Sequence, residues 1–437
     1  ASSGRLALAA PSVHAPGDDE FAWKVEQILR SEPGLSERAL AAALEQLGPR
    51  GVPALFVTLG RGALSPLEPL GAPEPLLEPQ RRALLSAAKR MPEACRVHAA
   101  TLAAAEALRA ERPAAVVVLG EIGDARDLPL LFALTRPVPE PADPAAPHGQ
   151  PRESQPLGDD QAAGFQRAVE LVLARDPFAY REIESPFLAA DNQLQLLAIQ
   201  AITNVGTLPA LELFSRLLGA RPQVDQQLLT SLSRVASSHA APFDGAIADR
   251  VRVYLHSSSA ESQREAALVA GKLEDVDALP FLIALLGHEN RGVRQNAYWS
   301  LRKITGLGFK DVPQAWTPWL EQQTQWWRET APDLFAELAS ADRPRALSIV
   351  QSLARRRFPR HALAAELARA LGHQDAEVRR LTCFALAQLR SRAAVPDLVD
   401  RFEDPDPEVR KEALRAARAI SGLDLPPERA IWEKALR

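Results

Sequence analysis

Few side chains in this sequence are spaced as catalytic groups usually are. Cys95 and His98 lie three residues apart, which would place a thiol beside an imidazole on one face of a helix. Such a pair can form a nucleophile and its base, but no third residue that would orient the imidazole is visible. His288 and Glu289 are adjacent at a turn between helical segments, where a solvated loop is the simpler interpretation. We therefore assign no catalytic residue.

Motifs for metals, phosphates and cofactors are missing from the sequence. The eight histidines are dispersed, none lies three or four residues from another, and no C-x-x-C occurs. The stretch "GRGALS" lacks the third glycine of a dinucleotide loop, and "AGKL" lacks the first glycine and the Ser/Thr of a P-loop. No G-x-S-x-G nucleophile elbow is present. We expect no metal, no cofactor and no enzymatic activity.

Tryptophan is concentrated in one place. Four of the seven tryptophans, Trp316, Trp319, Trp326 and Trp327, lie in the stretch "TGLGFKDVPQAWTPWLEQQTQWW". Exposed tryptophans are typical anchors of protein interfaces, whereas buried ones seal packed helices. The cluster is therefore a candidate for a binding surface or for a structural junction.

A second cluster is basic. The segment "LARRRFPRH" carries Arg355, Arg356, Arg357 and Arg360 around a phenylalanine. It could contact an anion or a nucleic acid, or it could be a solvated helix end whose charges offset the helix dipole. The formal net charge of −4 and the pI of about 6.1 favour the second interpretation, because nucleic-acid-binding chains are usually basic over a whole face. We expect nucleic acid not to be the partner.

Composition indicates many short helices. Hydrophobic residues make up 46% of the 437 residues but aromatic residues only 5%, and 36 prolines imply frequent helix ends. Arginine far outnumbers lysine, as in proteins from GC-rich bacterial genomes. Two cysteines 288 positions apart suggest no disulfide, and no apolar run is long enough to span a membrane. The sequence is compatible with the bacterial cytoplasm and with the periplasm or cell envelope, and does not choose between them.

An internal duplication is the strongest signal in the sequence. Residues 259–320 align with residues 375–436 at a constant offset of 116, with sixteen identities and no gap. Gly306 and Trp316 thereby match Gly422 and Trp432. We expect each copy to end in the same way: a helix stops at the glycine, an extended segment crosses over, and a short helix plants a buried tryptophan as a structural plug. Trp319, Trp326 and Trp327 have no counterpart in the second copy.

A shorter unit repeats within each copy. Its first signal is a polar residue followed by Val-Arg near the start of a helix, as in "NRGVR", "DAEVR" and "DPDPEVR". Its second signal is A-x-P-x-L, in which the proline starts the next helix. Asp406 is a predicted N-cap, Pro407 suits the first helical position, and Gly422 is a predicted C-cap. Each unit is thus a pair of antiparallel helices that must stack on its neighbours to bury its apolar stripe.

These motifs resemble bacterial HEAT repeats of the short, phycobilisome-lyase-like type. The resemblance is strong over 259–303 and 375–422, fair over 107–135 and 192–218, and weak elsewhere. It implies an all-α fold, a right-handed α-solenoid of stacked antiparallel helix pairs of the HEAT/ARM kind. It also implies that Arg294, Arg379 and Arg410 form a structural ladder between repeats.

Composition and pattern divide the chain into five segments. A flexible leader (1–19) precedes N-terminal helical repeats (20–135), and a Pro-rich disordered insertion or linker (136–160) follows. Central HEAT repeats (161–323) and C-terminal HEAT repeats (324–437) each end in a tryptophan cap.

The predicted function is that of a non-enzymatic scaffold that binds protein partners through the surface of the solenoid. The resemblance leaves two alternatives open, a phycobilin-lyase-like or chaperone-like enzyme and a HEAT-like DNA-binding or repair protein. The former needs a tetrapyrrole pocket and the latter a broad basic groove. The oligomeric state stays open. The candidate partner-binding residues are Trp319, Trp326, Trp327, Arg355, Arg356, Arg357 and Arg360.

Overall fold

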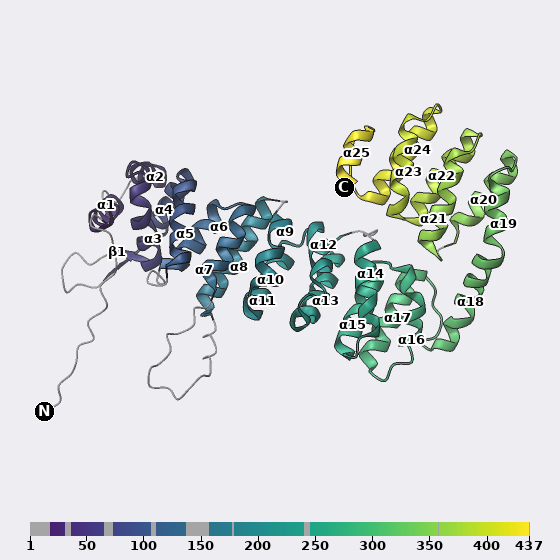
Figure 1. Ribbon diagram of the computed structural model, residues 1–437, viewed down its shortest axis with the longest axis horizontal. Coiled ribbons are helices and arrows are strands. Elements are labelled where there is room, and N and C mark those ends of the chain that lie inside the picture. The colour runs from purple at the N-terminus through teal and green to yellow at the C-terminus, as the bar shows by residue number, and fades with distance from the viewer. Residues whose placement is uncertain are drawn as a thin grey trace. The chain divides into compact units, whose positions relative to one another are not determined.

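A computed structural model of the chain shows helices joined by tight turns and packed into two compact units, residues 1–213 and 214–437 (Figure 1). Each unit is described by itself. The leader and the Pro-rich segment predicted for 136–160 fall almost wholly outside the described residues. The described residues are 18–30, 36–64, 73–105, 111–136, 157–176, 179–239, 245–356 and 358–436.

The first unit consists mainly of short helices that follow one another along the chain. The run "AAVVVLG", although rich in valine, lies in α6 with most of its side chains buried. The elements are α1 (Asp18–Arg30), α2 (Glu37–Glu45), α3 (Val52–Arg61), β1 (Ala63–Leu64), β2 (Glu74–Pro75), α4 (Glu78–Arg90), α5 (Pro92–Ala104), α6 (Arg112–Ile122), α7 (Leu128–Thr135), α8 (Asp159–Arg175), α9 (Ala179–Glu182), α10 (Glu184–Ala189), α11 (Asn192–Val205) and α12 (Leu208–Leu217), whose last residues belong to the second unit.

The second unit holds both copies of the duplication. Its long helices α13, α15 and α17 pack side by side, and so do α20, α22 and α24. The elements are α13 (Pro222–Ser237), α14 (Gly245–Val253), α15 (Ala260–Lys272), α16 (Leu279–Leu285), α17 (Arg291–Thr305), α18 (Pro313–Glu329), α19 (Ala331–Leu338), α20 (Arg343–Ala354), α21 (Arg360–Ala368), α22 (Ala376–Leu389), α23 (Val395–Val399), α24 (Pro407–Ser421) and α25 (Arg429–Leu436).

The predicted fold class, an all-α solenoid of stacked antiparallel helix pairs, is confirmed. Two short strands are an unexpected detail. β1 and β2 pair antiparallel, with Ala63 opposite Pro75 and Leu64 opposite Glu74. Each strand has only two residues, so neither could produce the alternating pattern by which strands are recognised in a sequence.

Helix ends in the second unit follow the predicted capping chemistry. The Asp406 carboxylate accepts hydrogen bonds from the backbone N–H groups of Glu408 and Val409 at 2.8 and 3.2 Å, which confirms it as the N-cap of α24. Gly306 and Gly422 end α17 and α24 with φ of 72° and 75°, a conformation that glycine adopts without steric cost. Equivalent positions of the duplication thus have equivalent local structure.

The tryptophan plugs are also equivalent. The Trp316 indole N–H donates to the carbonyl oxygen of Lys310, and the Trp432 indole N–H donates to that of Pro426, both at 2.8 Å. Both side chains are fully buried, and each donates to the residue six positions before it. Trp316 meets Phe309 edge to face, whereas Trp432 meets Phe402 in the same way.

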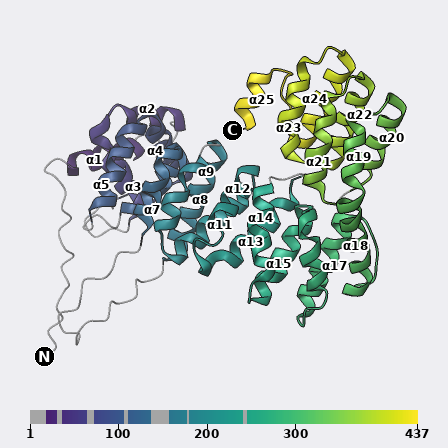
Figure 2. The ribbon, with the colours of Figure 1, turned by 45° about the vertical axis from the view of Figure 1, so that its right-hand side comes forward.

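The first copy of the duplication ends within one long helix, α18. α18 contains 17 residues and extends from α17 toward α19 in both views (Figures 1 and 2). Its first turns carry the buried Trp316, and its last turn carries Trp326 and Trp327. These last two side chains pack against the core formed by α20 to α24.

Candidate functional site

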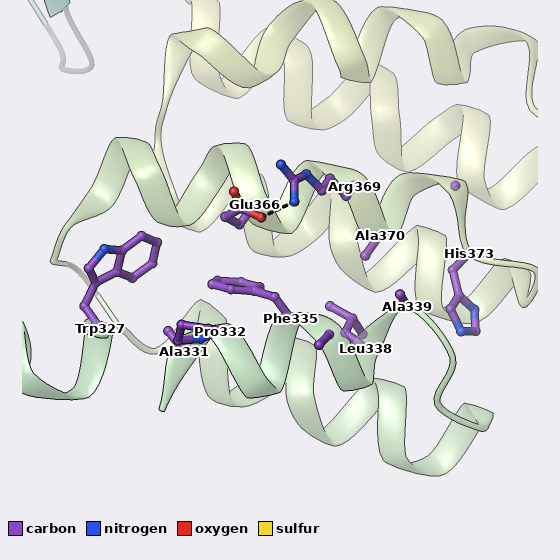
Figure 3. A pocket seen from close by; sticks show the side chains of 12 residues that line it. Trp327, Ala331, Pro332, Phe335, Leu338, Ala339, Glu366, Arg369, Ala370 and His373 are labelled. Atoms are coloured by element: carbon purple, nitrogen blue, oxygen red, sulfur yellow. Dashed lines mark ion pairs between the residues drawn. The ribbon is translucent and has the colours of Figure 1, made fainter. Parts of the chain in front are cut away.

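An apolar groove lies between α19 and the segment formed by α21 and the 3-10 turn η6 (Arg369–Gly372). Its volume is about 630 Å³. Trp327 lies at one end, and the Phe335 ring extends from α19 between the two walls (Figure 3). The remaining lining residues are Ala331, Pro332, Ala336, Leu338, Ala339, Glu366, Arg369, Ala370, Gly372 and His373.

The groove exists because α18 ends and α19 begins within two residues. Thr330 ends α18, with its backbone N–H bonded to the Trp326 carbonyl, and Pro332 occupies the first turn of α19. At this break the Trp327 ring meets Phe335 edge to face, with the ring centroids 5.8 Å apart. Both rings are only partly buried, so their free faces contribute to the groove.

The polar groups at the groove already have partners. The Glu366 carboxylate pairs with the Arg369 guanidinium at 2.7 Å on the upper wall (Figure 3). His373 is buried; its Nε2 lies 3.3 Å from the carbonyl oxygen of Ala341, and its Nδ1 accepts the backbone N–H of Asp375 at 3.1 Å. Neither ring nitrogen is therefore free to move a proton for a ligand in the groove.

The structure distributes the candidate tryptophans over different surroundings. Trp319 meets the buried Trp316 edge to face, with centroids 6.4 Å apart. Trp326 lies beneath the guanidinium of Arg356, whose Cζ atom is 3.6 Å from the ring centroid. Burial lowers the pKa of Arg356, but a guanidinium stays charged at neutral pH, so the contact is a cation–π interaction. Trp327 alone of the three lines the groove.

The candidate arginines are distributed in the same way. Arg355 is exposed at the end of α20, and Arg357 lies outside the described residues. Arg356 faces α18, where it also donates to the Gln323 side chain at 3.1 Å. Arg360 lines a second, smaller cavity beside α15 and α17. The basic segment therefore does not form one patch in the part of the chain that the structure describes.

A protein-family model described as HEAT repeats matches residues 248–331 and 364–431. These segments are HEAT repeats. No curated protein matches the sequence. Similar solved structures include an engineered protein (16% identity, TM-score 0.28, covering 91% of this chain and 98% of that one) and human deoxyhypusine hydroxylase in complex with glycerol (17%, 0.23, 60% and 96%). Another concerns Kap95p binding to RanGDP (13%, 0.34, 92% and 54%), so this chain spans about half the length of that one.

The three arginines of the HEAT signature share one local contact. Each donates through Nη1 to the two backbone carbonyls five and six residues before it, which tethers the turn that leads into its own helix. Arg379 also binds Asp404 of the next repeat through two hydrogen bonds of 2.8 Å. The contacts described for Arg294 and Arg410 are those with their own turns. The hydrogen bonds to a neighbouring repeat are seen at Arg379.

Neither suspected catalytic pair has the geometry of a catalytic site. The Cys95 thiol is buried against the Ala88 carbonyl oxygen, and burial raises its pKa to about 12, opposite to what a nucleophile needs. The His98 ring packs edge to face on Phe56. His288 accepts the backbone N–H of Asn290 within a turn.

The described ranges contain neither a metal-binding cluster nor a membrane-spanning helix. No group of three or more His, Cys, Asp or Glu side chains there is placed to hold a metal ion. Among those same residues, no helix has the length and apolar character needed to cross a membrane.

Reasoning from the sequence missed most of the groove. Phe335, Ala336 and Ala339 lie in the short helix "APDLFAEL", which has an apolar face but no feature that marks it as exposed. The second cavity has a signal that could have been found. Glu274 and Arg390 occupy equivalent positions of the duplication, with opposite charges, and they form an ion pair at 3.3 Å.

Proposed function

We propose that this protein is a non-enzymatic scaffold whose HEAT-repeat solenoid binds a protein partner, and that the groove between α19 and α21 receives a short peptide segment of that partner. The observation that carries the proposal is the apolar groove of about 630 Å³, into which Trp327 and Phe335 present partly exposed rings. Aromatic residues in such positions supply most of the binding energy of protein interfaces.

The polar side chains that line the groove favour a peptide over a small cofactor as its ligand. Small-molecule sites place a few free polar groups so that they converge on the ligand. Here Glu366 and Arg369 pair with each other, and both nitrogens of His373 are engaged. Recognition then depends on apolar contact, as when an amphipathic segment places its anchor side chains in a groove. The occupant we expect is a segment with at least one large apolar anchor.

In this proposal two other candidate residues, Trp326 and Arg356, support the groove. Trp326 and Arg356 hold the last turn of α18 against the end of α20, and so fix the position of the adjoining Trp327. Replacing Trp326 by alanine should therefore weaken partner binding indirectly. The same variant should also lower the stability of the second unit, because the ring packs against its core. Replacing Trp327 by alanine should weaken binding directly, because its ring lines the groove, and should also lower stability, because this ring packs against the same core.

Two finer parts of the sequence interpretation stay proposals. We propose that the repeats are of the short bacterial, phycobilisome-lyase-like type, which is supported by "DAEVR" and "DPDPEVR", whose first aspartates lie 31 residues apart. We also propose that 161–323 are central HEAT repeats and 324–437 are C-terminal HEAT repeats, each ending in a tryptophan cap, which is supported by the matching tryptophan plugs.

The test fills the groove without disturbing the core. Ala336 is exposed and lines the groove, whereas Ala365 is exposed on α21 outside the lining, so Ala336→Arg and Ala365→Arg are matched in chemistry. Peptides selected from a random display library on the full-length wild-type chain should bind the Ala365→Arg variant normally. They should lose at least tenfold in affinity for Ala336→Arg, about 1.4 kcal/mol, because a bound peptide must displace the arginine side chain or desolvate its charge. Equal binding to both variants, or no selectable peptide, would refute the docking groove.

A further inference from the structure

A second cavity lies between the two HEAT segments of the second unit. Its volume is about 230 Å³, and its walls come from the turn after α15, the end of α17, the first turn of α21 and the end of α22. The lining is mostly polar and contains three basic side chains. The lining residues are Glu274, Val276, Lys303, Ile304, Arg360, Gln388, Leu389 and Arg390.

The Glu274 carboxylate forms ion pairs with two of the three basic side chains. The Glu274 carboxylate lies 3.3 Å from the Arg390 guanidinium and 3.6 Å from the Lys303 ammonium. Arg390 and Lys303 are about half exposed, so both can reorient toward a ligand in the cavity. The lining therefore presents three positive charges to a single negative charge.

Arg360 shares its neighbouring carboxylates with other cations. Its Nε atom is shielded from solvent and has no hydrogen-bond acceptor among the residues that the structure describes. Glu274, Asp275 and Asp277 all lie near enough to favour its charge, but Glu274 also pairs with Arg390 and Lys303, and the carboxylates of Asp275 and Asp277 lie 3.5 Å from Arg252. Asp277 is also 3.9 Å from His361. A shielded guanidinium donor without an acceptor is costly, and an anion in the adjoining cavity would satisfy it.

We propose that this cavity binds a small oxyanion of the phosphate class, held by Arg360, Lys303 and Arg390. A guanidinium matches two phosphate oxygens at once, and an ammonium adds a point charge that can follow the ligand. The cavity is large enough for one phosphate group. An anion here would contact side chains from α17, α21 and the end of α22, and so would link the first HEAT segment to the second. This inference is independent of the peptide groove.

Calorimetric titration of the full-length chain with inorganic phosphate, at an ionic strength fixed with sodium chloride, tests the proposal. Wild-type protein should bind one phosphate saturably. Arg360→Gln should weaken binding about tenfold to a hundredfold, because it removes charge-assisted hydrogen bonds to the anion. Arg390→Gln is a second variant, in which the exposed pair with Glu274 is lost at little cost to folding. Arg355→Gln, an exposed arginine outside the cavity, is the control.

Phosphate binding that falls in both cavity variants but not in Arg355→Gln supports the site. A parallel titration with O-phosphoserine distinguishes a free anion from a phosphate group carried by a larger molecule, and saturable binding of either one supports the chemistry. The proposal is overturned if neither ligand binds, if Arg360→Gln and Arg390→Gln bind as well as wild type, or if Arg355→Gln loses as much affinity as they do. The same titrations leave the peptide assay untouched, so the two proposals fail separately.

Discussion

The ion pair between Arg379 and Asp404 should be a major source of stability in the C-terminal repeats. It joins two consecutive HEAT repeats, and its side chains are only 10% and 1% exposed. Replacing Asp404 by alanine removes both 2.8 Å hydrogen bonds from Arg379 and an acceptor for the backbone N–H of Asp406. The guanidinium then stays buried without a counter-ion.

The magnitude follows from this geometry. Removing one partner of a buried ion pair costs about 3–5 kcal/mol, because the remaining charge is uncompensated. Arg379 keeps its hydrogen bonds to the carbonyls of His373 and Gln374, at 2.9 and 3.0 Å, so we expect a value of about 3–4 kcal/mol. The matched control is Glu377→Ala on the same helix. Glu377 pairs with Arg380 at the surface, with 35% and 41% of the side chains exposed, so its loss should cost at most about 1 kcal/mol.

Urea unfolding followed by tryptophan fluorescence is the assay. Six of the seven tryptophans belong to the second unit, and Trp432 packs on Phe402, two residues from the substituted position. With an m-value of about 2–3 kcal/mol per molar, Asp404→Ala should lower the midpoint by roughly 1–2 M.

A double variant completes the test. Combining Arg379→Met with Asp404→Leu removes both charges and should recover most of the lost stability, since well-packed apolar pairs replace buried ion pairs at little cost. The reasoning is wrong if Asp404→Ala shifts the midpoint no more than Glu377→Ala does, or if the double variant is as unstable as the single one.

Three further outcomes are expected. Burial works against ionisation of Asp404, but hydrogen bonds from Arg379 and from a backbone N–H outweigh it and lower its pKa; the stabilisation is thus present above about pH 4 and lost as pH falls through the lower folded pKa, so urea midpoints of wild type and Asp404→Ala should converge in acid. Gly306→Ala should cost about 1–2 kcal/mol because its φ is 72°, whereas Gly308→Ala, equally uncrowded, should be near neutral in the same unfolding assay; equal effects would contradict this. Burial raises the pKa of the Cys95 and Cys383 thiols to about 12, so an aromatic disulfide reagent at pH 8 should label them only after unfolding, and rapid labelling of native protein would show the burial to be wrong.

The sequence predicts the helix ends because the capping interactions involve residues that are close in the chain. The Asp406 carboxylate accepts hydrogen bonds from the backbone N–H groups two and three residues after it. Gly422 ends its helix through its own backbone angle φ. The equivalence of Trp316 and Trp432 was also readable, because both copies carry the same glycine-to-tryptophan spacing. Stacking follows from the same pattern, since a lone helix pair cannot bury its apolar stripe.

The surroundings of individual side chains were not readable in this way. Arg356 and Arg360 lie four positions apart in one basic segment, yet the first stacks on Trp326 and the second lines a cavity beside Glu274. The chain turns between α20 and α21, and the direction of that turn depends on how the second HEAT segment packs.

The repeat, its caps and its plugs are therefore properties of the sequence, because each arises from interactions within a few residues or from a spacing that recurs. The groove and the second cavity are properties of the packing. Trp327 meets Phe335 because the helix breaks between α18 and α19, and Glu274 meets Arg390 across 116 positions because the second HEAT segment packs beside the first. Contacts between distant residues depend on the summed geometry of every intervening turn, which no local pattern records.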